Sequence, residues 1–179
     1  MNWADVQTAL VDVTRLALDD ASYDVGWADR EARWRAASHV RLSVLSNAPN
    51  GQDERRYTDE AGDLRERVYG NRRLVISFRC ETTDQDLESS ALAAADNIAA
   101  GLRQSDVEAL LDAAGIGLAR IENPRVISAP DGKGAIRSVV VLDVRFNAHI
   151  SKTGPLVTRV ESVAGTGTVD GLTVEIDVP

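Results

Sequence analysis

The sequence has few of the residues that redox or metal chemistry needs. It holds one cysteine and two histidines in 179 residues, so an internal disulfide is excluded and nothing indicates an oxidising compartment. Aromatic residues make up only 4%, which leaves a core of Val, Leu, Ile and Ala. No apolar run approaches the roughly 20 residues that span a bilayer, and the first residues lack the pattern of a secretion signal. We therefore expect no membrane partner and folding in the cytoplasm.

Basic residues are also in deficit. The chain has 20 Lys and Arg against 28 Asp and Glu, a net charge of −8. This balance argues against nonspecific binding to nucleic acid, because such binding needs cationic side chains that displace counterions from phosphates. It remains compatible with a protein past which DNA slides without adhering. With 44% hydrophobic and 27% charged residues, the composition is that of a globular protein, and the length suits a single domain spanning residues 1–179.

The hydrophobic pattern predicts alternating helical and extended segments. Apolar residues at three- and four-residue spacing predict a helix over 3–19, whereas residues 20–38 show no clean period. Period-two alternation predicts strands, and the Asp170-Gly171 dipeptide predicts a turn. For the helix predicted over 105–114, Ser105 is the expected N-cap and Gly115 is expected to end the helix. The remaining predicted segments are strands at 39–46 and 74–81, helices at 86–103 and 105–114, an extended run at 117–128, a long strand over about 136–150, and two extended runs in the tail.

This order of segments predicts an α+β fold. We expect an antiparallel β-sheet with the helices packed on one face. Three segments lie outside the central pattern: the N-terminal helix within residues 1–20, a projecting polar loop or hairpin at 47–73, and a C-terminal β tail at 166–179.

The projecting segment is the most polar part of the chain. Residues 50–73 contain six acids and six arginines and are therefore neutral. Two interpretations remain open. The segment is a solvated hairpin whose charges pair with one another, or it is an arm that docks on a neighbouring subunit through complementary charge.

No stretch has the pattern of an active site. In "GNRRLVISFRCETTD" the alternation places Cys80 on the apolar side of a strand, where a free cysteine packs as a small hydrophobe. "GIGLAR" has Arg120 in place of the third glycine of a dinucleotide-binding loop, and "GKG" lacks the rest of a phosphate loop. His39 and His149 lie far apart, and His149 is expected at a surface or an interface. We predict no catalytic residue, no cofactor and no metal ligand.

Four stretches resemble one known family. "RLSVLSNAPNGQDERRY" is followed by "RLVISFRCETTDQDLESSALAAADNIAAGL", "LLDAAGIGLARIENPRVIS" and "IRSVVVLDVRFNAHIS". In their order and local sequence, over residues 35–165, these stretches resemble neck proteins of tailed bacteriophages of the tail terminator type. The shared features are a polar loop after the first strand, a strand running into an Ala-rich helix, and a long strand before "VTRVESV".

The resemblance implies a structural virion protein and not an enzyme. Such a protein would assemble in the host cytoplasm as a homo-hexameric ring that caps the tail tube and joins it to the head connector or adaptor proteins, with the sheath as a possible further neighbour. DNA would pass through the lumen without sequence-specific binding. The alternatives are a neighbouring head-completion or tail-tube component, a non-viral binding module, or an enzyme with an unrecognised site. The candidate interface residues are Trp3, Arg55, Arg56, Asp59, Glu60, Arg65, Glu66, Arg67, Arg72, Arg73, Arg145 and His149.

Overall fold

The computed structural model describes residues 2–29, 38–60, 63–82, 90–127, 129–130, 136–156, 163–169 and 172–178. The chain divides into two compact units, one formed by residues 1–54 and 69–152 and the other by residues 55–68 and 153–179. The predicted turn at Asp170-Gly171 and the first residues of the predicted helix 86–103 lie outside the described residues.

The fold is α+β, as predicted. In the described residues the helices are α1 (Trp3–Leu18), α2 (Ala91–Gly101) and α3 (Ser105–Ala113). Two of the strands are long for a globular domain: β4 has 20 residues and β8 has 21. The strands are β1 (Tyr23–Trp27), β2 (Ser38–Pro49), β3 (Glu54–Glu60), β4 (Asp63–Thr82), β5 (Ile116–Ile121), β6 (Arg125–Val126), β7 (Ala129–Pro130), β8 (Ile136–Leu156), β9 (Val163–Val169) and β10 (Leu172–Val178).

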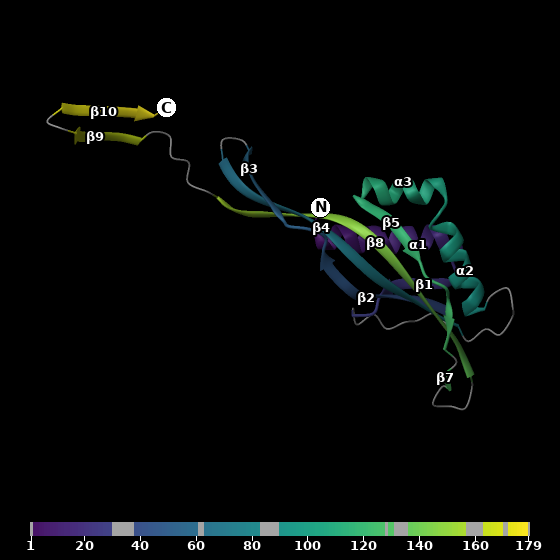
Figure 1. Cartoon of the computed structure of the whole chain (residues 1–179). Helices are drawn as coiled ribbons and strands as arrows, with labels where there is room; N and C mark the ends of the chain where they lie inside the picture. The colour runs from purple at the N-terminus through teal and green to yellow at the C-terminus, as the bar shows by residue number, and fades with distance from the viewer. Residues whose placement is uncertain are drawn as a thin grey trace. The chain divides into compact units, whose positions relative to one another are not determined.

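The main sheet has the strand order β1-β2-β4-β8-β5 (Figure 1). Strand β2 runs antiparallel to β4, and β5 runs antiparallel to β8, but β1 runs parallel to β2. The sheet is therefore mixed, and the expectation of an antiparallel sheet is wrong. Strand β1 was missed in the sequence because five residues with Asp24 and Gly26 among them give too short an alternation to recognise. The short strands β6 and β7 continue the pairing along β8, and Pro124 lies in the break between β5 and β6.

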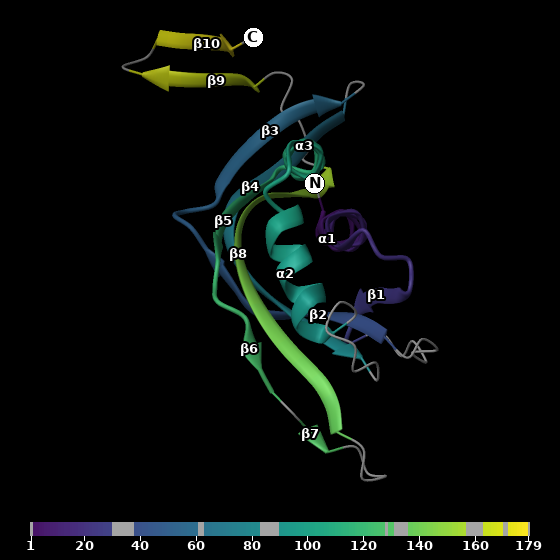
Figure 2. The same ribbon diagram turned by 90° about the vertical axis from the view of Figure 1, so that its right-hand side faces the viewer.

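All three helices lie on the concave side of the curved sheet (Figure 2). Helix α1 buries Val6, Leu10 and Val13, and α2 buries Ile98 together with small residues from Ala91 to Gly101. The alternating residues of β4 and β8, among them Phe78 and Phe146, complete the same core. The predicted packing of helices on one face is therefore confirmed, and none of the described helices lies on the opposite, convex side of the sheet.

The helix ends follow the local sequence with one exception. The Asn2 side chain accepts from the Asp5 amide and the Asp5 side chain accepts from the Asn2 amide, which forms a capping box at α1. The predicted cap of α3 is wrong: Gln104 is the N-cap, without a side-chain cap bond, and Ser105 is already helical. The predicted stop is confirmed, because Gly115 adopts φ +58°, a conformation that glycine reaches at little cost.

The second unit consists of strand segments from two parts of the chain. Within it, β3 pairs with β4 as a hairpin, in the region of the predicted polar hairpin. Arg55 Nε and Glu66 Oε1 lie 3.6 Å apart across this hairpin. The tail forms the antiparallel pair β9–β10, with Leu172 opposite Val169 and Val178 opposite Val163, which confirms the two extended runs.

Candidate functional site

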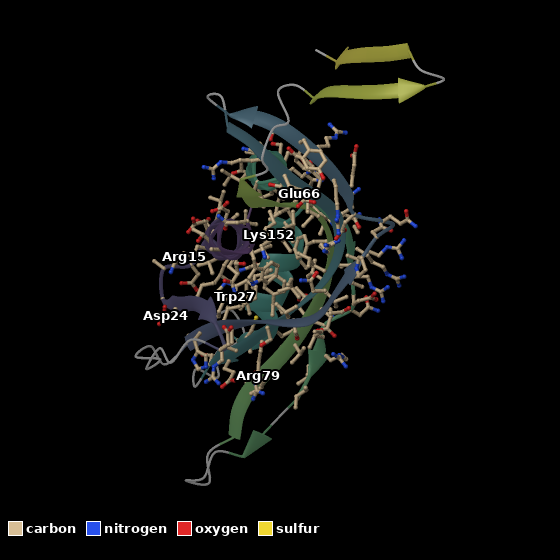
Figure 3. All side chains as sticks on the ribbon, turned by 90° about the vertical axis from the view of Figure 1, so that its left-hand side faces the viewer. Arg15, Asp24, Trp27, Glu66, Arg79 and Lys152 are labelled. Atoms are coloured by element: carbon tan, nitrogen blue, oxygen red, sulfur yellow. The ribbon has the colours of Figure 1, made fainter. Side chains whose placement is uncertain are left out.

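The side of the sheet opposite the described helices collects arginines from five strands. We call it the arginine face; the cross-strand register places Arg41 opposite Arg79 and Arg120 opposite Arg145. Side-chain nitrogens line this convex side in Figure 3, away from α1 and the labelled Arg15. Because directly opposite like charges repel, each arginine pair needs a compensating anion. The charged residues of the arginine face are Arg41, Arg73, Arg79, Arg120, Arg125, Arg145, Glu81, Glu122 and Asp143.

Glu81 compensates the first pair of arginines. Its Oε1 lies 2.6 Å from Arg79 Nε, and its Oε2 lies 3.8 Å from Arg41 Nη2 and 3.3 Å from His39 Nε2. Arg41 Nη2 is also 2.9 Å from His39 Nε2. Since a guanidinium only donates, the His39 nitrogen accepts this bond. His39 and Glu81 are buried, so this cluster is a structural element of the sheet and offers little to a ligand.

Glu122 compensates the second pair in the same way but at the surface. Its Oε1 lies 3.3 Å from Arg120 Nε and 3.1 Å from Arg145 Nε. Close by, Arg125 Nη2 donates to Asp143 Oδ2 over 2.5 Å. Both glutamates stand two residues after an arginine of their pair, as Arg79-x-Glu81 and Arg120-x-Glu122. With six arginines against three carboxylates, the arginine face keeps a net positive charge.

A groove of about 470 Å³ opens on this face across β4. Its charged side chains are Arg73 and Arg145, and no carboxylate lines it. Ser46, Asn50 and Asn147 add neutral hydrogen-bonding groups. Arg73 is exposed. Although Arg145 also contacts Glu122, a groove lined by two guanidinium groups and no carboxylate is suited to a carboxylate or another anionic group.

The segments that contain the helices and β1 have the opposite charge. We define the acidic helix layer as residues 2–29 and 90–115, which contain α1, α2, α3 and β1. It contains ten carboxylates and two arginines, a net charge of −8. Some of the acids have partners inside the chain: Asp5 belongs to the capping box, and Asp12 pairs with Arg15. Helix α3 carries Asp106, Glu108 and Asp112 and no basic residue.

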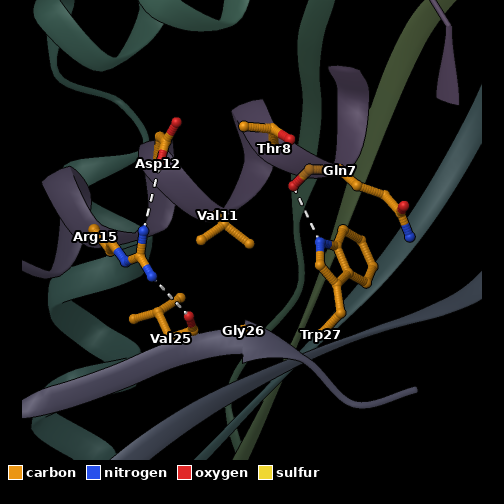
Figure 4. A pocket seen from close by; sticks show the side chains of 8 residues that line it. All are labelled: Gln7, Thr8, Val11, Asp12, Arg15, Val25, Gly26 and Trp27. Atoms are coloured by element: carbon orange, nitrogen blue, oxygen red, sulfur yellow. Dashed lines mark hydrogen bonds and ion pairs between the residues drawn. The ribbon is translucent and has the colours of Figure 1, made fainter. Parts of the chain in front are cut away.

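A second hollow, of about 270 Å³, lies between α1 and β1 (Figure 4). Its polar groups already bind one another. Arg15 Nη2 donates to the Val25 carbonyl over 3.2 Å, and Trp27 Nε1 donates to the Gln7 carbonyl over 3.0 Å. These bonds fix the edge strand β1 against α1, so we interpret the hollow as part of the packing.

Cys80 is fully buried, as the alternation predicts. Burial raises the pKa of its thiol from 9.0 to about 12, so it is protonated at neutral pH, whereas reactive cysteines need a thiolate. Within the part of the chain that the structure describes, no group of three or more His, Cys, Asp or Glu side chains is placed to hold a metal ion. His149 is exposed; its ring stacks on Tyr69 at 5.8 Å, and Nδ1 donates to Asn71 Oδ1 over 3.1 Å.

The predicted interface residues do not form one cluster. Trp3 packs against its own core, 6.3 Å from the Trp27 ring, which favours packing of α1 within its own subunit. Arg72 holds both oxygens of Asp53, at 2.6 and 2.7 Å, and lowers the pKa of that carboxyl. Arg73, Arg145 and His149 lie on the arginine face. The side chains of Asp59 and Glu60 lie outside the described residues, and the others belong to the second unit: Arg55, Arg56, Arg65, Glu66 and Arg67.

The sequence interpretation missed most of the arginine face. Arg41, Arg79, Arg120 and Arg125 are scattered over more than 80 residues, and each is only one polar position of an alternating strand. The available signal was the repeated Arg-x-Glu spacing, once within β4 and once at the end of β5. That spacing becomes informative only when the register shows which arginine stands opposite.

Comparison with protein-family models and with curated proteins assigns the chain to no family. No protein-family model matches the chain, and no curated protein matches it. In the described residues no helix is both long and apolar enough to cross a membrane.

Proposed function

We propose that this chain is a structural protein of the bacteriophage neck, a tail terminator whose subunits form a homo-hexameric ring. The ring caps the tail tube, stops its growth and joins it to the head connector. The proposal starts from the sequence resemblance over residues 35–165. It requires subunits that bind one another head to tail, because a ring uses two different patches on each subunit.

The observation that carries the proposal is the segregation of charge between two faces of one unit. The acidic helix layer has a net charge of −8, whereas the arginine face has twice as many arginines as carboxylates. Complementary patches on opposite sides of a subunit favour heterologous contact and disfavour the self-facing contact of a two-fold dimer. The Cys80 thiol is buried and protonated, and the polar groups between α1 and β1 bind one another. Both observations fit a protein that acts by binding other proteins.

Deletion of the gene from the phage or prophage that encodes it tests this proposal. We expect tails of irregular and excessive length that fail to join heads, with normal tails restored by expression of the wild-type chain from a plasmid. Mass spectrometry of purified particles should find the chain in the virion. Normal tail length in the deletion strain, or particles without the chain, would contradict the proposal. Headless tails of normal length would favour the alternative of a head-completion component.

A further inference from the structure

The groove on the arginine face has the charge and the size to receive a helix side from another copy of the chain. It is lined by Arg73 and Arg145 without a carboxylate, and Arg145 is 57% exposed although it also contacts Glu122. Val75 and Ala48 add an apolar contribution to its lining. An occupant must therefore supply anionic groups around a small apolar contact.

Helix α3 meets this description. Its buried side consists of Val107 and Leu111, which leaves the opposite side outward. That side carries the three acids Asp106, Glu108 and Asp112, and Leu110 is 46% exposed beside them. Ala109 and Ala113 are small and exposed, so they allow a close approach to a sheet.

Two acids of α1 are less suitable. Asp5 is held in the capping box and Asp12 pairs with Arg15. Among the described residues, by contrast, no ion pair joins an acid of α3 to a basic side chain. Its carboxylates would therefore gain a cationic partner without losing one.

We propose that α3 of one subunit docks into the Arg73–Arg145 groove of the next copy, with carboxylates of α3 on the two guanidinium groups. The contact joins two different surfaces and so propagates from subunit to subunit. This inference rests on the proposed ring and specifies which surfaces meet in it.

Reversal of charge on each surface separately gives the test. The groove variant is Arg73→Glu with Arg145→Glu, and the helix variant is Asp106→Lys with Glu108→Lys and Asp112→Lys. Each alone should raise the dissociation constant for self-association at least about 30-fold, the effect expected when a contact between charged pairs is lost. An equimolar mixture should recover the assembly, because the reversed groove of one variant accepts the reversed helix of the other in alternation around the ring.

Arg103→Glu and Asp96→Lys serve as matched controls, because both residues are exposed on the helix layer outside α3. Both should assemble like the wild type. A pair of milder changes, Arg73→Ala with Arg145→Ala, keeps the test valid if the charge reversal impairs folding. Circular dichroism and thermal melting establish that each variant is folded, and size-exclusion chromatography with light scattering measures its mass, with and without purified tail tubes.

The outcomes separate this inference from the proposed function. If the groove and helix variants assemble like the wild type, or if their mixture fails to recover assembly, the docking of α3 is wrong while the ring proposal stands. If the wild type stays a monomer both alone and with tail tubes, the proposed function fails and the docking fails with it.

Discussion

Burial decides the chemistry of Cys80. The pKa of its thiol is raised from 9.0 to about 12 in the folded chain, whereas in the unfolded chain it keeps its ordinary value. Below about pH 9 the thiol is protonated in both the folded and the unfolded chain. Its contribution to the free energy of unfolding is then at its full value and does not change with pH. Between pH 9 and 12 only the unfolded chain releases the proton. The free energy of unfolding should therefore fall by about 1.4 kcal/mol per pH unit from this group.

Urea denaturation of the wild type and of Cys80→Val at pH 8, 9, 10 and 11 measures this effect. The stability difference between the two proteins should be constant up to pH 9 and should then move in favour of the variant. Tyrosines and lysines that titrate in the same range affect both proteins alike. Parallel stability curves up to pH 11 would show that Cys80 is accessible to water in the native state.

Glu81 and Glu122 perform the same task at different depths. Each bridges two opposite arginines, but the side chain of Glu81 is 5% exposed and that of Glu122 is 30% exposed. Glu81→Gln leaves Arg41 and Arg79 facing each other without an anion, so we expect a loss of about 2 kcal/mol in the free energy of unfolding. Glu122→Gln should cost less than about 1 kcal/mol because solvent screens its partners. Equal losses in urea denaturation would contradict this assignment.

The crossing of α1 and α2 depends on one glycine. A methyl group at Gly101 would lie 2.3 Å from the Ala17 carbonyl oxygen and 2.6 Å from the Ala17 Cα atom. These are backbone atoms, so the helices must move apart. We expect Gly101→Ala to destabilise the protein by about 1–3 kcal/mol despite the better helix propensity of alanine.

Gly117 is the matched control, because a methyl group there would find only the Asn147 carbonyl oxygen, at 4.0 Å. Gly117→Ala should leave the melting temperature unchanged or slightly raised. A melting temperature of Gly101→Ala equal to that of the wild type would mean that α1 and α2 do not cross so closely.

The elements that could be predicted are those in which a regular hydrophobic pattern continues over many consecutive residues. The stripe from Val6 to Ala17 predicts α1, and the alternation around Phe78 and Phe146 predicts β4 and β8. Strand β1 is too short for this signal, and the cap at Gln104 lacks the side chain that normally marks an N-cap. Each failure lies where tertiary packing, and not local sequence, holds the backbone.

The arginine face could not be predicted, because it depends on register. The alternation correctly places Arg79 and Glu81 on the polar side of their strand, but it does not reveal that Arg41 stands opposite. The irregularities at Val44/Ser46 and Leu118/Arg120 shift the pairing further, and such shifts have no signature in a single strand. The groove at Arg73 and Arg145 is a product of these pairings.

Taken over the whole chain, the net charge of −8 conceals a basic surface. The acidic helix layer alone has this value, so the rest of the chain is neutral in sum and the arginine face is positive within it. Average charge argues against polyanion binding, yet the segregation of charge favours attraction between copies. Self-association that arises from this attraction must depend on ionic strength.

We expect the dissociation constant for self-association to rise between 0.1 and 1 M NaCl, because the screening length falls from about 10 to about 3 Å over this range. Sedimentation velocity at several protein concentrations measures this dissociation constant. The control variants Arg103→Glu and Asp96→Lys should show the same salt dependence as the wild type. Variants with alanine at Arg73 and Arg145 should associate weakly at low salt and respond little to added salt. An apolar interface would behave in the opposite way, since burial of apolar surface is not weakened by screening. Association that is unchanged or stronger in 1 M NaCl would therefore exclude charge complementarity as the force between subunits.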